Sequence, residues 1–244
     1  MSLGLEICID SYHSAKAAIA GGADRLEVCS SLALGGLTPS IGLVRMLKKT
    51  FPEAPLFCML RTRSGNFSYS EDDLNVMKED LIDLKNAGAA GFVFGFLDEE
   101  FNLDVKTCKE FIDLADKLPC TLHRAFDVAQ NWKRCLDEAV EIGFKYILTS
   151  GRHATAIEGA SELFEIVNYA KTRITIMAGS GVNSQNLKQL IDQTNAPWYH
   201  GSAAKKVMGE TKNKIAMGSA DMDDLKYTCS EETRKMKNLL LNSH

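Results

Sequence analysis

The sequence lacks any run of about 18 consecutive apolar residues, and this absence argues against a transmembrane helix. It also lacks a block of basic residues. With a formal net charge of −4, it does not have the composition of a protein that binds nucleic acid or an anionic membrane surface. The start of the chain lacks the apolar stretch of a signal peptide. We therefore expect a cytoplasmic protein with neither nucleic-acid nor membrane partners, and we expect residues 1–4 to include the remnant of an expression tag.

Cysteine pairs spaced as C-x-x-C are also absent, and the seven cysteines are scattered and odd in number. This pattern is not that of a disulfide framework, so we expect reduced thiols in a reducing compartment. Only five prolines interrupt the chain, and 45% of its residues are hydrophobic. The 244 residues are therefore enough for a sizeable core, in one large domain or in two small ones.

Strand-like and helix-like segments alternate from residue 5 to about residue 204. The segments AGGADRLEVC, NAGAAGFVFG and EIGFKYILTS each end a helix at a glycine and then enter a strand, which indicates one repeating unit. Eight such strands predict an α/β fold, a TIM-like (β/α)8 barrel that forms a single domain over residues 1–244. An open doubly wound sheet is the alternative, but it usually has fewer strands and often a glycine-rich first turn, where this chain has DSYHS. The expected strands span 5–10, 25–30, 56–61, 91–96, 120–126, 145–150, 173–179 and 198–203, and the expected helices lie near 12–21, 41–49, 71–87, 104–117, 131–142, 155–171, 183–193 and 222–240.

Residues 205–222 show no apolar periodicity and are rich in Gly, Ser, Lys and Asn. This composition predicts a long mobile loop over the C-terminal ends of the strands, ahead of the last helix. The sequence leaves open whether the loop acts as a lid or is simply disordered.

The phrases LEICID (5–10) and LEVCSS (26–31) repeat a carboxylate and a thiol two positions apart. Because a strand alternates its faces, Glu6 and Cys8 share one face, and Glu27 and Cys29 share the corresponding face of the next strand. Each strand therefore packs its aliphatic side chains on one side and presents acid and sulfur on the other.

Polar and small residues gather where the predicted strands end, in HRAFD, LTSG and AGSGVN. In a barrel these ends form the mouth at which chemistry is usually done. Charged groups near a barrel axis are costly unless they are paired, so we expect a pocket with a network of charges. A purely structural charge network is the alternative interpretation. The candidate catalytic residues are Glu6, Glu27, Arg61, His123, Arg124, Asp127, Ser150, His200 and Ser202.

Two segments are candidates for binding an anion. Gly179, Ser180 and Gly181 follow the seventh predicted strand, where many barrels hold a phosphate through backbone N–H groups. Arg61 and Arg63 lie in RTRSGNFSYS, and arginine forks suit carboxylate or phosphate oxygens. Each segment also has a structural interpretation, because the asparagine after the turn is a suitable helix cap and the arginine loop could be a solvated surface loop.

Several motifs in order, LEICIDSYHSAKAAIAGGADRLEVCSSLALGGLTPS, RTRSGNFSYS, LHRAFD, ILTSG, GSGVN and YHGSA, resemble the CutC family of copper homeostasis proteins from residue 5 to about residue 204. The resemblance implies a TIM-like barrel that is cytoplasmic or, in animals, partly nuclear, and that forms a homodimer or homotetramer. It implies a role in copper tolerance through Cu(I) binding, with no established enzymatic reaction. The chain departs from the family's usual residues at Thr62, Asn66, Ala178 and Gly201.

Cu(I) is a soft ion that prefers thiolates, so the resemblance makes Cys8 and Cys29 the expected metal ligands. His123 or His200 could complete such a site or act as acid and base. Adjacent strands of a barrel are staggered, so the two sulfurs could also miss each other and be buried structural thiols. The alternative functions are a metal-independent barrel enzyme that acts on a small phosphorylated or carboxylated metabolite, and a barrel without any ligand.

Overall fold

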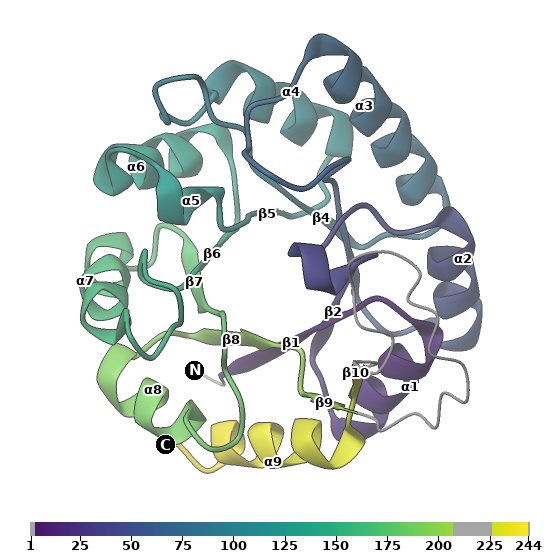
Figure 1. Cartoon of the computed structure of the whole chain (residues 1–244), viewed down its shortest axis with the longest axis vertical. Coiled ribbons are helices and arrows are strands. Elements are labelled where there is room, and N and C mark those ends of the chain that lie inside the picture. Colours follow the sequence, from purple (N-terminus) through teal and green to yellow (C-terminus); the bar gives the residue numbers. More distant parts are fainter. Residues whose placement is uncertain (1–2, 207–225, 244) are drawn as a thin grey trace, which may run out of the picture.

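A computed structural model describes residues 3–206 and 226–243 of the chain. Eight parallel strands form a closed barrel in the order of the sequence, and the last strand pairs with the first to complete the ring. Helices surround this ring on its outside (Figure 1). The predicted TIM-like barrel is therefore confirmed. The strands are β1 (Gly4–Ile9), β2 (Arg25–Val28), β3 (Leu56–Met59), β4 (Gly91–Phe94), β5 (Cys120–Leu122), β6 (Tyr146–Thr149), β7 (Thr175–Ala178) and β8 (Trp198–Gly201).

Five of the helices begin at a polar side chain that caps the first turn. Ser11, Ser40, Ser70, Asp104 and Asn131 each accept a hydrogen bond from the backbone N–H group three residues later. These caps fix the residue at which each of these helices begins after the loop that follows a strand. The helices are α1 (Tyr12–Gly21), the short 3-10 turn η1 (Leu32–Leu34), α2 (Ile41–Thr50), α3 (Glu71–Asn86), α4 (Val105–Ala115), α5 (Ala125–Val128), α6 (Trp132–Ile142), α7 (Ala160–Ala170), α8 (Leu187–Thr194) and α9 (Ser230–Leu241).

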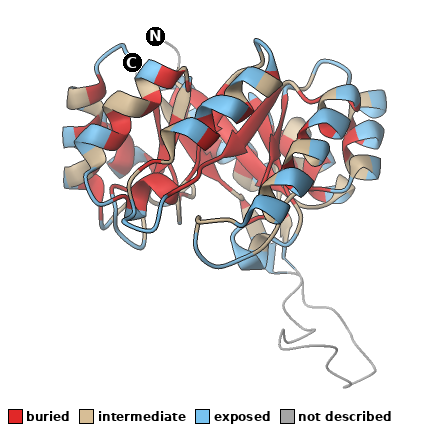
Figure 2. Cartoon of the chain, turned by 90° about the horizontal axis from the view of Figure 1, so that it is seen from above, coloured by how far each residue is buried: buried red, intermediate tan, exposed pale blue. Residues whose placement is uncertain are grey.

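The main apolar core lies between the barrel and its helices. Figure 2 shows the strands as a buried band between helices whose outer surfaces are exposed. In β1, Ile7 and Ile9 belong to this core and are 0% exposed. The alternate residues, Glu6 and Cys8, point to the barrel interior instead, as the period of the strand requires.

Several of the predicted boundaries are wrong. Most of the predicted strands are one to two residues too long, and the helix predicted at 183–193 begins at 187. The fifth strand ends at Leu122, not at 126, because residues 125–128 form a helical turn in which Phe126 N–H bonds to His123 O. The helix predicted at 155–171 begins at 160, as α7. The last helix begins at 230, after a strand β10 (Lys226–Thr228) that pairs with β9 (Ala204–Lys206) and that the sequence did not indicate.

The predicted loop at 205–222 falls almost entirely outside the described residues, apart from the two lysines that end β9. Among the helices of residues 3–206 and 226–243, none has the length and apolar character needed to cross a membrane.

Candidate metal centre

A buried arginine lies in the barrel interior near the N-terminal ends of the strands. The Arg25 side chain is 3% exposed, and its guanidinium carbon lies 3.8 Å, 4.3 Å and 4.8 Å from the ring centres of Phe57, Tyr146 and Trp198. Its Nε donates a hydrogen bond to Glu6 Oε2 at 2.5 Å. A charge at this depth is tolerated because a carboxylate pairs with it and aromatic faces surround it.

Glu6 connects this arginine to His200 on β8. Its Oε1 lies 2.8 Å from His200 Nδ1, so the two carboxylate oxygens each contact a different basic side chain. Burial acts to raise the pKa of Glu6, but Arg25 and His200 outweigh it and hold the pKa below its usual value. Glu6 is thus a buried carboxylate with a partner on each oxygen.

Three side chains of the types that bind metals converge beside this pair. Ligand atoms of Cys8, Glu27 and His200 all lie within 4.8 Å of one another, and all three residues are buried. Since Nδ1 of His200 faces Glu6, its Nε2 is left for the group and lies 3.8 Å from Glu27 Oε2. Elsewhere in residues 3–206 and 226–243, no other three such side chains come together as closely.

The group meets a simple test of fitness for a cation. Glu27 Oε1 is buried but finds no hydrogen-bond partner among the described residues. A buried acceptor without a partner is costly, and a bound ion would supply the missing contact. Thiolate, carboxylate and imidazole are moreover the three side-chain ligands that Zn²⁺ takes, and thiolate is the one that Cu(I) prefers.

Cys29 lies next to this group without belonging to it. Its Sγ is 3.5 Å from Glu27 Oε2, and burial, followed by the Glu27 charge, raises its pKa well above the usual value. Gly36 covers the sulfur so closely that a Cβ atom there would lie 3.1 Å from Sγ, at a φ of +83° that favours glycine. The structure therefore brings Cys8 into the converging group and places Cys29 at its edge.

Strand register explains this arrangement. Cys8 on β1 lies opposite Glu27 on β2, not opposite Cys29, and Glu6 lies opposite Arg25. The two repeats are thus offset by two residues in the sheet, which places an acid beside a thiol. The stagger of barrel strands was the signal that could have pointed to Glu27 as a candidate ligand.

Comparison with known proteins identifies the family of the chain. Residues 3–205 match the CutC family. The chain belongs to the CutC family. A copper homeostasis protein cutC homolog from Caenorhabditis elegans is 47% identical over 233 residues, which are 96% of this chain and 93% of that protein. The human cutC homolog is 37% identical over 235 residues, which are 95% of this chain and 84% of that protein.

Solved structures agree with the CutC family at the level of the fold. A crystal structure of CutC from Streptococcus agalactiae has a TM-score of 0.78 at 29% identity and covers 82% of this chain and 98% of its own. A phosphoribosylanthranilate isomerase from Thermotoga maritima has a TM-score of 0.60 at 12% identity and covers 98% of both chains, which shows the shared barrel alone.

Arg61 and Arg63, the arginines expected to bind an anion, are largely engaged by the chain itself. Arg61 is 6% exposed and donates hydrogen bonds to the backbone carbonyls of residues 34, 36 and 65, so it ties two mouth loops together. Arg63 pairs with Asp73 and donates to Ser68 O. The role of these arginines in binding an anion stays a prediction.

His123 lies at the mouth, outside the converging group. Its Nδ1 accepts the N–H of Ala125, so in the neutral ring the proton is on Nε2, which finds no acceptor among the described residues. Burial, and then the charge of Arg61, lowers the pKa of His123 to about 3. The ring of Phe67 lies over it, with 4.7 Å between the ring centres.

A hydrogen-bonded cluster links the segments that follow β5 and β6, and it consists of Arg124, Asp127 and Ser150. Asp127 accepts hydrogen bonds from Arg124 Nε, from Ser150 N and Oγ, and from Thr149 Oγ1. Arg152 N–H is a further donor to Asp127 Oδ1. A carboxylate with this many donors is held in place and offers little capacity for a ligand.

The predicted phosphate turn lies beside a hollow of about 360 Å³ whose lining includes Gly181, Ser202 and Glu232. A carboxylate of the chain itself binds beside this turn: Glu232 Oε1 accepts a hydrogen bond from the backbone N–H of Ser184 at 2.7 Å. Gly179 packs directly against His200, since a Cβ atom there would lie 3.2 Å from His200 Cβ. Anion binding by Gly179, Ser180 and Gly181 stays a prediction.

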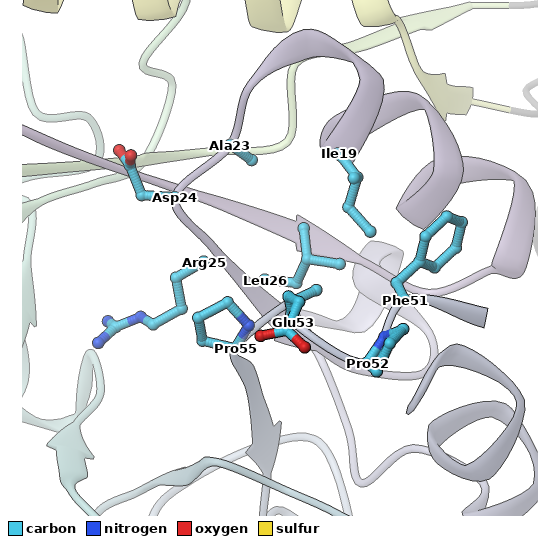
Figure 3. Close-up of a pocket in the computed structure, with 10 residues that line it drawn as sticks. Ile19, Ala23, Asp24, Arg25, Leu26, Phe51, Pro52, Glu53 and Pro55 are labelled. Carbon is cyan, nitrogen blue, oxygen red and sulfur yellow. The ribbon is translucent and has the colours of Figure 1, made fainter. Parts of the chain in front are cut away.

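A second hollow, of about 400 Å³, lies on the outside of the barrel, next to α1 and the segment after α2. Figure 3 shows Ile19, Leu26 and Phe51 around it, while the Arg25 side chain extends away from it. Its largely apolar lining includes neither cysteine nor histidine, so it is separate from the candidate metal centre.

We predict that Glu6→Gln lowers the free energy of unfolding by roughly 3–5 kcal/mol, because it leaves the buried Arg25 charge without its partner. Urea unfolding followed by circular dichroism measures this loss. Thr121→Val is a matched control inside the same barrel. Its buried hydroxyl has no partner among the described residues, so its removal should leave the free energy of unfolding unchanged or raise it. Equal stability of Glu6→Gln and the wild type would contradict the structural role given to the pair.

We predict a loss of stability in acid that comes from His123. Its pKa is lowered from 6.5 to about 3, so below pH 6.5 the unfolded chain takes up a proton that the folded protein does not. The free energy of unfolding should therefore fall by up to about 1.4 kcal/mol for each pH unit between these values. His123→Gln should flatten this dependence of the free energy of unfolding on pH. His153→Gln is the control, because this histidine is exposed, and it should keep the wild-type slope. Equal slopes in the wild type and in both variants would show that the prediction is wrong.

Proposed function

We propose that this protein binds Cu(I) in the cytoplasm and acts in copper homeostasis, with Cys8 and Cys29 as thiolate ligands and His200 beside them. The observation that carries the proposal is the convergence of Cys8, Glu27 and His200 inside the barrel of a CutC family member. Relatives from a nematode and from human are named as copper homeostasis proteins, which supports the same function here.

The chemistry of the interior is suited to a soft monovalent ion. Burial is the largest contribution that raises the pKa of both Cys8 and Cys29, so the free protein holds these groups as thiols. Binding of Cu(I) would release the thiol protons, because a metal ligand must be deprotonated. The ion's positive charge then cancels one of the two thiolate charges, in a place where an uncompensated charge is costly.

The contacts around His200 support its part in the site. Glu6 accepts from Nδ1 of His200, so Nε2 faces Cys8 and Glu27. A carboxylate behind a ligating histidine fixes the ring and makes it a better ligand. Arg25 balances the charge of that carboxylate in turn.

Location and assembly follow from the same proposal. All seven cysteines are free thiols, which fits the reducing cytoplasm. We propose a homodimer or homotetramer, as the resemblance to the CutC family implies.

We predict that the double variant Cys8→Ser, Cys29→Ser loses stoichiometric Cu(I) binding, because serine replaces both soft donors with hard ones. Competition with a chromophoric Cu(I) chelator under reducing, oxygen-free conditions measures the affinity. Cys58→Ala is the control, since this buried thiol packs in the core outside the barrel and should leave binding unchanged. Unchanged Cu(I) affinity in the double variant would show that Cys8 and Cys29 are not the Cu(I) ligands.

A second candidate function, a metal-independent enzyme acting on a small phosphorylated or carboxylated metabolite, is favoured by one observation at the mouth. His123 Nε2 and Arg61 Nε are both buried donors that lack acceptors among the described residues, and the Phe67 ring lies against both side chains. Such donors suit an anionic oxygen.

This second function predicts that phosphate, sulfate or a small carboxylate raises the melting temperature, because a ligand that binds only the folded state stabilises it. Differential scanning fluorimetry with a panel of anions is the measurement. The rise should disappear in Arg61→Met. If no anion shifts the wild-type melting temperature, the second function is rejected.

A further inference from the structure

We propose that the Cys8, Glu27 and His200 group is also a binding site for Zn²⁺, a divalent ion of intermediate softness, and that Glu27 and Cys29 divide the selectivity between Zn²⁺ and Cu(I). The part of this proposal that concerns Cu(I) rests on the function proposed above. The part that concerns Zn²⁺ rests on the geometry of the three side chains alone.

The donor set is the first argument. One sulfur, one carboxylate oxygen and one imidazole nitrogen lie within 4.8 Å of one another, and His200 Nε2 is 3.8 Å from Glu27 Oε2. Tetrahedral Zn²⁺ with bonds of about 2.0–2.3 Å holds its ligand atoms roughly 3–4 Å apart. Zn²⁺ accepts all three donor types, and three protein ligands with a fourth position left open are a common zinc arrangement. Cu(I), in contrast, gains little from a carboxylate.

Charge is the second argument. A Cys8 thiolate and a Glu27 carboxylate together carry two negative charges, so a dipositive ion with neutral His200 leaves the group neutral. The nearest other charges, Arg25 and Glu6, form an ion pair and cancel each other. With Cu(I) on two thiolates, Glu27 would instead be a further negative charge next to an already negative site, which a buried location disfavours.

The two buried glutamates differ in a way that identifies the ligand. Both oxygens of Glu6 contact a basic side chain, one Arg25 and the other His200. Glu27 has one oxygen near His200 Nε2 and Cys29 Sγ, whereas its Oε1 has no hydrogen-bond partner among the described residues. Glu6 is therefore engaged behind the histidine, and Glu27 is the carboxylate available to an ion.

The test measures the affinities of the whole chain for Zn²⁺ and for Cu(I) separately. The protein is freed of metal and reduced, and each ion is titrated alone in competition with a chromophoric chelator. We expect the wild type to bind one Zn²⁺. Glu27→Gln should weaken Zn²⁺ binding at least tenfold and leave Cu(I) binding within about threefold, because a neutral amide is a poor substitute for a charged ligand.

Two further variants complete the comparison. Cys29→Ser should do the opposite, with Cu(I) weakened and Zn²⁺ spared, and Cys8→Ser should weaken both ions. Thr121→Val is the control for a substitution inside the barrel and should change neither affinity. Circular dichroism checks that each variant is folded.

A measurement on the wild type alone covers the case in which a variant does not fold. Co²⁺ in place of Zn²⁺ should give a thiolate-to-metal charge-transfer band together with the intense visible absorption of a four-coordinate ion. A wild type that takes up no Zn²⁺, Co²⁺ spectra without the thiolate band, or equal losses of both ions in Glu27→Gln would each overturn the proposal. If Zn²⁺ binds as expected and Cu(I) does not, the Zn²⁺ site stands and the proposed copper function fails.

Discussion

The interior of this barrel depends on the ion pair between Arg25 and Glu6. A charge on the axis of a barrel has little water to solvate it, so it persists only with a partner of opposite sign and with polarisable neighbours. Arg25 has both, because Glu6 accepts from its Nε and three aromatic rings surround its guanidinium. The second oxygen of Glu6 is then free to hold His200. The pair therefore lies next to the candidate metal centre and also sets the direction of its imidazole.

The convergence of Cys8, Glu27 and His200 next to this ion pair is a consequence of strand stagger. Two nearly identical phrases occur on neighbouring strands, yet their thiols do not lie opposite each other, since Cys8 pairs in register with Glu27. The shear of the closed barrel shifts one strand against the next, so a repeated pattern of acid and thiol becomes an alternation of unlike ligands. This shift explains why the candidate site brings together sulfur, oxygen and nitrogen atoms rather than two sulfurs alone.

Many polar side chains at the mouth of the barrel form hydrogen bonds that hold the loops in place. Arg61 holds carbonyls of two loops, Asp127 joins the ends of β5 and β6, and Glu232 accepts the Ser184 N–H beside the turn after β7. Loops that end parallel strands carry many backbone groups without ladder partners, and side chains of the barrel satisfy them. Only His123 Nε2 and a few other buried atoms remain without partners in the described part of the chain.

The alternation of strands and helices, and the face on which Glu6, Cys8, Glu27 and Cys29 lie, could be predicted from the sequence, because side-chain periodicity is a local property of the chain. The family was equally readable from its motifs. The end of β5 was not, since the helical turn at residues 125–128 is joined to β6 through Asp127, which accepts a hydrogen bond from Thr149 Oγ1. Nor could the sequence tell which polar side chains would meet. Tertiary structure alone decided that Glu27 joins Cys8, because register and loop contacts arise between segments that are distant along the chain.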